Sequence, residues 1–105
     1  IMGGAGCLFP PNSLHKDVFD KEKILNLIPT HDDIYFWAMA VINNKKIKIA
    51  QTKDFNIYTI DGTQKFGLCK INKRGKCGMC PNIAFEKIAK EYPIFYKKIE
   101  SAKNA

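Results

Sequence analysis

Residues 32–42 of the chain read DDIYFWAMAVI. The two aspartates suit the positive end of a helix dipole, and the apolar residues that follow leave little polar face. We therefore predict a mostly buried helix over residues 32–41, with the Thr30 hydroxyl as its N-cap. The apolar run is far shorter than the roughly 18 to 20 residues of a bilayer span, so the sequence predicts no transmembrane helix.

The regions on either side of this helix carry weaker periodic patterns. Apolar residues at helical spacing predict an amphipathic helix over residues 17–28, which Pro29 ends. A last helix is predicted from residue 82, interrupted near Pro93 and continuing through residue 99. Further patterns predict short strands over residues 4–9, 46–50 and 55–60 and a flexible basic loop over residues 64–81. The expected fold class is therefore α/β (or α+β), with a few strands packed against about three helices.

Length and composition indicate one small basic domain. The chain has 105 residues, and 17 Lys and Arg against 10 Asp and Glu give a net charge of +7. A hydrophobic content of 46% excludes the disordered and collagen-like classes. Residues 1–6 lack the basic region of a signal peptide and lead at once into an apolar run. We therefore expect residues 1–105 to be a single domain that is a fragment of a longer protein.

Four cysteines, at positions 7, 69, 77 and 80, allow three interpretations. Cys77 and Cys80 form a C-x-x-C pair, which can hold zinc if Cys69, His15 or His31 completes the tetrahedron. The same pair can be a redox dithiol, although such pairs normally open a helix after a strand. The third interpretation is reduced thiols in a cytosolic protein. The spacing leaves all three open.

The acidic pair Asp32 and Asp33 is the strongest candidate for chemistry. Carboxylates in a first helical turn can simply complement the helix dipole. Here a glycine-rich run, residues 3–6, precedes them, and glycines allow a bulky ligand to approach the backbone closely. A carboxylate at a helix start beside such a segment can take a proton from a hydroxyl nucleophile.

Four motifs carry a family resemblance: GGAGCLFPP at residues 3–11, SL at residues 13–14, DVF at residues 17–19 and PTHDDIYF at residues 29–36. Together they resemble the C-terminal part of bacterial nucleotide-sugar glycosyltransferases with the GT-A type of fold, which form polysaccharides.

The resemblance implies an inverting transferase with its general base in the acidic pair. Asp33 is then the base and Asp32 orients it or binds acceptor hydroxyls, although the two roles can be exchanged. The residues expected to contact the substrate are Gly3, Gly4, Ala5, Gly6 and His31. His31 can hydrogen-bond a sugar or the neighbouring carboxylate, or it is only an exposed loop histidine.

The resemblance also implies parts that lie elsewhere. Such enzymes bind the nucleotide through an N-terminal half, where an Asp-x-Asp motif holds Mn or Mg, and no Asp-x-Asp occurs in these 105 residues. We therefore expect no cofactor and no metal site in the chain, and no sugar transfer by the chain alone. The implied partners are a nucleotide-sugar donor and a glycan acceptor. The expected location is the cytoplasm, at the inner face of the membrane.

Lysine-rich segments raise the question of a membrane contact. Residues 45–53 and 70–76 can lie against anionic lipid head groups, or they form only a solvated basic face. We also expect the chain to self-associate through the apolar side of residues 4–9.

The alternative function is a small nucleic-acid-binding module. Its zinc site would use Cys69, Cys77 and Cys80, and its lysines would contact phosphates. The main interpretation has no nucleic-acid partner, because Arg74 is the only arginine and the lysines are spread along the whole chain.

Overall fold

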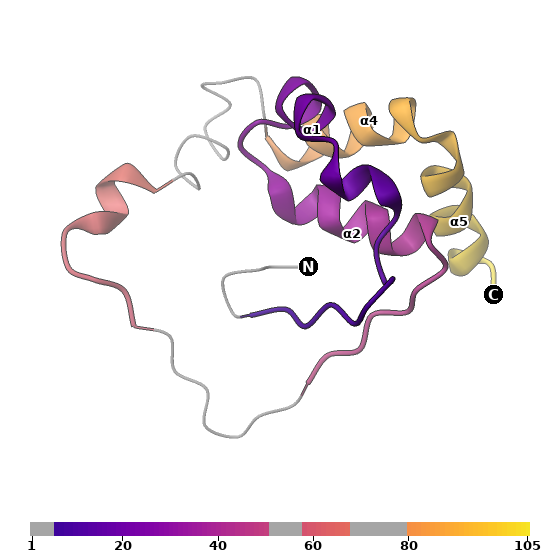
Figure 1. Ribbon diagram of the computed structural model, residues 1–105, viewed down its shortest axis with the longest axis horizontal. Helices are drawn as coiled ribbons and strands as arrows, with labels where there is room; N and C mark the ends of the chain where they lie inside the picture. Colours follow the sequence, from indigo (N-terminus) through magenta and orange to yellow (C-terminus); the bar gives the residue numbers. More distant parts are fainter. Residues whose placement is uncertain (1–5, 51–57, 68–79) are drawn as a thin grey trace.

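The computed structural model describes residues 6–50, 58–67 and 80–105 (Figure 1). Within these ranges every regular element is a helix. The elements are the α-helices α1 (Lys21–Leu27), α2 (Asp32–Ile42), α4 (Pro81–Glu91) and α5 (Pro93–Lys103) and the 3-10 helices η2 (Lys16–Phe19) and η3 (Thr63–Phe66). The expected α/β fold class is therefore wrong, since the part of the chain that the structure describes is all-helical.

The segments expected to be strands contain no strand where they are described, at residues 6–9, 46–50 and 58–60. A strand needs a neighbour for its backbone hydrogen bonds and a cover for its apolar face. In residues 46–50 that face is open, because Ile47 is 49% exposed and Ile49 is 84% exposed. Gly6 has a φ of 95°, in the left-handed region, so the chain bends there. The alternating pattern belongs to exposed segments and not to half-buried strands.

Helix α2 forms the centre of the helical group (Figure 1). It packs against α4 and α5, and α1 packs against α4. Its Tyr35, Ala38 and Met39 side chains are at most 1% exposed, which confirms the predicted buried helix. The fully buried side chains that α4 and α5 add to this core are Ala84, Ile88 and Phe95.

Aromatic rings fill the contact between these three helices. The Trp37 ring meets the Phe95 ring edge-on, with the ring centroids 5.2 Å apart. The Phe85 ring packs against both, at 5.5 Å from Phe95 and 6.3 Å from Trp37. Edge-on and tilted rings at these separations add to the stability that burial alone supplies. These rings therefore fix α5 and α4 against one side of α2.

The break between α4 and α5 lies at the predicted interruption. Tyr92 separates the two helices with φ −123° and ψ 78°, and Pro93 is the first residue of α5. A residue before proline avoids the helical conformation because the proline ring clashes with it, so the chain turns at this point.

The predicted helix over residues 17–28 is wrong in its first part. The chain forms η2 and then breaks at Asp20, whose carboxylate accepts a 3.0 Å hydrogen bond from the Lys23 backbone N–H and so caps α1. The predicted cap of α2 is also wrong. His31, and not Thr30, is the N-cap residue of α2, and its side chain makes no capping hydrogen bond.

Residues 58–67 lie apart from the helical group (Figure 1). Tyr58, Ile60 and Phe66 are each more than three-quarters exposed, at 86%, 77% and 78%. Most of the predicted basic loop, residues 68–79, lies outside the described residues. Among the helices that are described, none is both long and apolar enough to cross a bilayer.

Candidate functional site

The acidic pair opens helix α2. Asp32 is exposed and Asp33 is half-buried, both in the first turn. The turns that follow place Tyr35 and Met39 in the core, where they are 1% and 0% exposed. Packing therefore fixes the position of the helix that carries the two carboxylates. Side chains on a packed helix are positioned more precisely than side chains on a loop.

The N-terminal segment runs along α2 in the opposite direction. At the C-terminal end of α2, Asn43 Nδ2 donates a 2.9 Å hydrogen bond to the carbonyl oxygen of Asn12. Nearer the start of α2, the Phe9 ring packs against the Phe36 ring with the centroids 5.8 Å apart. The course from Asn12 to Phe9 therefore leads from the end of α2 toward its beginning, where the acidic pair lies (Figure 1).

Gly6 is the described end of the glycine-rich run. Three residues of extended chain span at most about 11 Å, so Gly6 lies within that distance of Phe9. Asp32 and Phe36 are four residues apart on one helix and therefore share a face. Gly6 is exposed, with open space where a side chain would stand. The run therefore ends within about 11 Å of Phe9, which packs against Phe36 on the α2 face that carries Asp32.

Of the other residues expected to contact substrate, the structure describes one and leaves three outside the described ranges. His31 is half-buried and directly precedes the acidic pair as the N-cap residue of α2. Gly3, Gly4 and Ala5 lie outside the described residues. The described residues of the candidate site around the start of α2 are therefore the acidic pair and His31.

This arrangement suits acid–base chemistry on a hydroxyl group. A carboxylate can accept a proton from a hydroxyl about 2.6 to 3.2 Å away. The exposure of Asp32 leaves the first turn accessible to a ligand in solution. Gly6 is exposed and has open space where a side chain would stand, so a bulky ligand can approach the backbone there.

A second polar cluster, which the sequence analysis missed, joins the N-terminal segment to α4. Asp17 Oδ2 accepts a 2.7 Å hydrogen bond from the Tyr92 hydroxyl and a 3.1 Å hydrogen bond from Lys23 Nζ. The Tyr35 hydroxyl donates a 2.8 Å hydrogen bond to the Asp17 carbonyl oxygen, and the Asp17 N–H donates to His15 Nδ1 at 3.3 Å. Asp17 and Tyr92 are 75 residues apart, so no local pattern signals their contact.

The cluster stabilises the ionised form of Asp17. The hydrogen bond from Tyr92, and then that from Lys23, hold the pKa of the Asp17 carboxyl below its ordinary value of 3.8. The hydrogen bond to Asp17 raises the pKa of Lys23, and burial raises the pKa of Tyr92. Because Oδ2 of Asp17 already accepts two hydrogen bonds, we interpret the cluster as a stabilising contact between these elements and not as a site for proton transfer.

Metal binding finds no support among the described residues, where no three His, Cys, Asp or Glu side chains are grouped to hold an ion. Cys7 and Cys80 are free thiols, exposed and half-buried respectively, and Cys80 is the N-cap residue of α4. Cys69 and Cys77, on which the zinc and redox interpretations depend, lie outside the described residues. Both interpretations therefore stay predictions.

Comparisons with protein families, with curated proteins and with solved structures find no match for this chain. The resemblance to glycosyltransferases therefore depends on the four sequence motifs alone.

Proposed function

We propose that this chain supplies the acceptor side, with the general base, of an inverting glycosyltransferase. The reaction transfers a sugar from a nucleotide-sugar donor to a hydroxyl group of a glycan acceptor. One observation supports the proposal most: the N-terminal segment runs along α2 from Asn12 to Phe9 toward the acidic pair. Two of the motifs therefore contact each other through Phe9 and Phe36, which are 27 residues apart in the sequence.

The acidic pair has distinct roles in this proposal. Asp33 accepts the proton of the acceptor hydroxyl while the hydroxyl oxygen attacks the anomeric carbon of the donor sugar. The bond between that carbon and the nucleotide diphosphate breaks, and the nucleotide leaves with the bonding electron pair. Asp32, which is exposed, holds the acceptor through its other hydroxyl groups. General-base catalysis of this kind contributes about 10²-fold to 10⁴-fold in rate.

Enzymes of the family that the motifs resemble use a divalent metal ion. The described residues of this chain do not form a site that would bind such an ion. They hold no group of three or more ligand side chains, and the sequence has no Asp-x-Asp. The mechanism therefore assigns no metal-dependent step and no nucleotide contact to this chain. The proposal includes a cytoplasmic location for the reaction.

The decisive experiment is Asp33→Asn in the complete transferase that the proposal implies. We expect transfer to fall about 10²-fold to 10⁴-fold, because the amide cannot accept the proton, while nucleotide-sugar binding stays unchanged. Glu22→Gln is the matched control, since Glu22 is an acidic residue in the first turn of α1. It should leave transfer unchanged.

Two outcomes count against parts of this assignment. Transfer near the wild-type level in Asp33→Asn removes Asp33 from the mechanism, and a loss confined to Asp32→Asn then makes Asp32 the base. Full activity in the double variant Asp32→Asn/Asp33→Asn rejects the proposed function. Far-UV circular dichroism checks that α2 persists, since each carboxylate contributes only about 0.3 to 1 kcal/mol to the helix start.

A further inference from the structure

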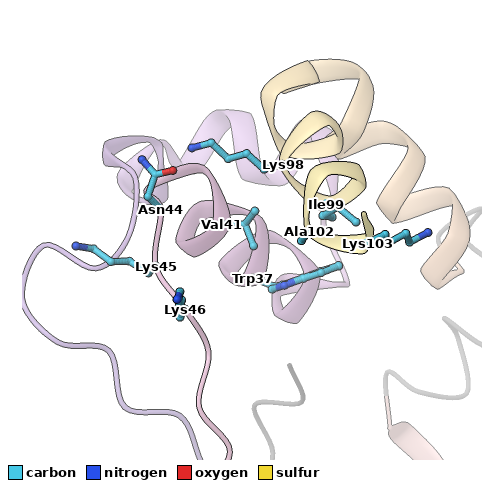
Figure 2. Close-up of a pocket in the computed structure, with 9 residues that line it drawn as sticks. All are labelled: Trp37, Val41, Asn44, Lys45, Lys46, Lys98, Ile99, Ala102 and Lys103. Atoms are coloured by element: carbon cyan, nitrogen blue, oxygen red, sulfur yellow. The ribbon is translucent and has the colours of Figure 1, made fainter. Parts of the chain in front are cut away.

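A groove with an apolar floor and a basic rim lies between the C-terminal half of α2 and the last turns of α5. Its volume is about 560 Å³. Figure 2 shows the residues that line it. The floor consists of Trp37, Val41, Ile99 and Ala102. The rim consists of Asn44, Lys45, Lys46, Lys98 and Lys103. The groove lies at the opposite end of α2 from the acidic pair, so it is separate from the site described above.

The end of α2 places two of the lysines on the rim. Asn44 adopts the left-handed conformation, with φ 57°, after the last residue of the helix. The Lys45 N–H donates a hydrogen bond to the Ala40 carbonyl oxygen at 3.0 Å, and the Asn44 N–H donates one to the Val41 carbonyl oxygen at 3.0 Å. This pair of hydrogen bonds is the Schellman motif, which ends a helix and fixes the direction of the chain that leaves it. Lys45 and Lys46 are therefore held beside the floor.

The rim carries an uncompensated positive charge. Of the residues that the structure describes, no aspartate or glutamate lines the groove. Lys98 Nζ donates a 2.6 Å hydrogen bond to the Ile42 carbonyl oxygen and so neutralises the negative end of α2. Within the described residues, Lys45, Lys46 and Lys103 form no ion pair. Figure 2 shows the Lys45 and Lys103 side chains pointing away from the floor in opposite directions.

Exposed apolar side chains follow the rim lysines in the sequence. Ile47 and Ile49 follow the rim lysines, alternate with Lys48 and are 49% and 84% exposed. A surface that mixes exposed isoleucines with lysines matches the interface of a bilayer, where ammonium groups meet anionic head groups and apolar side chains reach the acyl region.

We propose that this groove and residues 45–50 bind the surface of a membrane that contains anionic lipids. Lys45, Lys46 and Lys103 contact the head groups, and Ile49 enters the interface beside the apolar floor. A nucleic acid fits less well, because contacts to phosphates leave the two isoleucines in water. The proposal does not depend on the proposed function.

Trp37 provides a direct measurement, since it is the only tryptophan in the chain and lies on the groove floor. The chain is mixed with phosphatidylcholine vesicles that contain phosphatidylserine, and with pure phosphatidylcholine vesicles. We expect about 100-fold tighter binding to the anionic vesicles, because each of three lysines contributes roughly fivefold near such a surface. Trp37 fluorescence should shift to the blue, and brominated acyl chains should quench it. Salt at about 1 M should abolish the binding.

Variants test whether vesicle binding depends on the groove residues or only on the net charge of the chain. Lys45→Gln/Lys46→Gln should weaken binding to the anionic vesicles about 25-fold. The matched control, Lys21→Gln/Lys87→Gln, removes the same charge from exposed positions on α1 and α4 and should weaken binding less than about threefold. Ile49→Ser changes no charge and should weaken binding about tenfold.

Three outcomes overturn the proposal. The first is no binding to anionic vesicles, and the second is equal weakening in the two double-lysine variants. The third is an unchanged Trp37 spectrum on vesicles together with a shift on addition of a single-stranded oligonucleotide, which would assign the groove to nucleic acid. Circular dichroism of each variant confirms that the helices are intact.

Discussion

The Tyr92 hydroxyl donates a 2.7 Å hydrogen bond to Asp17 Oδ2 across 75 residues of sequence. Lys23 Nζ donates to the same oxygen at 3.1 Å. Through these two contacts the break between α4 and α5 is tied to η2 and α1. The N-terminal segment that leads toward the acidic pair is therefore anchored at Asp17 as well as at Asn12.

Removing the Tyr92 hydroxyl should destabilise the fold. Tyr92→Phe keeps the ring and deletes only the donor, and a hydrogen bond to a charged group contributes about 1.5 to 3 kcal/mol. We expect a loss of about 1.5 kcal/mol in the free energy of unfolding, measured by urea denaturation. Tyr58→Phe is the control, because Tyr58 is 86% exposed and should change stability by less than about 0.5 kcal/mol. Equal effects of the two variants would show that the hydroxyl of Tyr92 has no special role.

The same cluster should make stability depend on acid pH. The pKa of Asp17 lies below 3.8 in the folded chain, so the unfolded chain binds the proton first as the pH falls. The contribution of Asp17 is complete well above pH 3.8 and is lost as the pH falls through the lower folded pKa. The free energy of unfolding of Asp17→Asn should therefore fall less steeply with decreasing pH than that of the wild-type chain. The measurement is urea denaturation from about pH 6 to pH 2.5. If the free energy of unfolding falls equally steeply with pH in both proteins, Asp17 does not contribute to the acid sensitivity.

The core prediction concerns Phe95, which is fully buried against Trp37 and Phe85. Phe95→Ala leaves a cavity at the contact of three helices, and such changes cost about 3 to 5 kcal/mol. Phe66→Ala deletes the same side chain from a position that is 78% exposed and should cost less than about 0.5 kcal/mol. Thermal unfolding followed by circular dichroism distinguishes the two. A large loss in Phe66→Ala would mean that residues 58–67 pack more closely than the structure shows.

Lys98 should stabilise the contact between α5 and α2. Its ammonium group donates to the Ile42 carbonyl oxygen at 2.6 Å, at the negative end of the α2 dipole. Lys98→Met keeps most of the apolar stem and should cost about 1 kcal/mol in the free energy of unfolding. Lys97→Met, at the neighbouring exposed position, removes the same charge and should be close to neutral. If both variants unfold at the same urea concentration, the hydrogen bond contributes nothing measurable.

Local sequence signals predicted the helical elements around the core. The apolar run of residues 32–42 is helical and buried because nearly every face of that helix must avoid water. Pro93 interrupts the last helix because its ring excludes a helical conformation at Tyr92. The acidic pair was likewise placed correctly at a helix start, since the preference of carboxylates for that position depends only on neighbouring peptide groups.

Tertiary structure decided the features that depend on distant partners. The alternating residues 46–50 remain exposed because no covering surface is packed against them, and an alternating pattern does not reveal whether a covering surface exists. The contact of Asp17 with Tyr92 and the groove between α2 and α5 likewise join residues that are far apart in the chain. The sequence by itself therefore determined the buried helix α2 and the break between α4 and α5. Only the packing of those helices decided that the described chain has no strand, where its charges are paired and where they stay free.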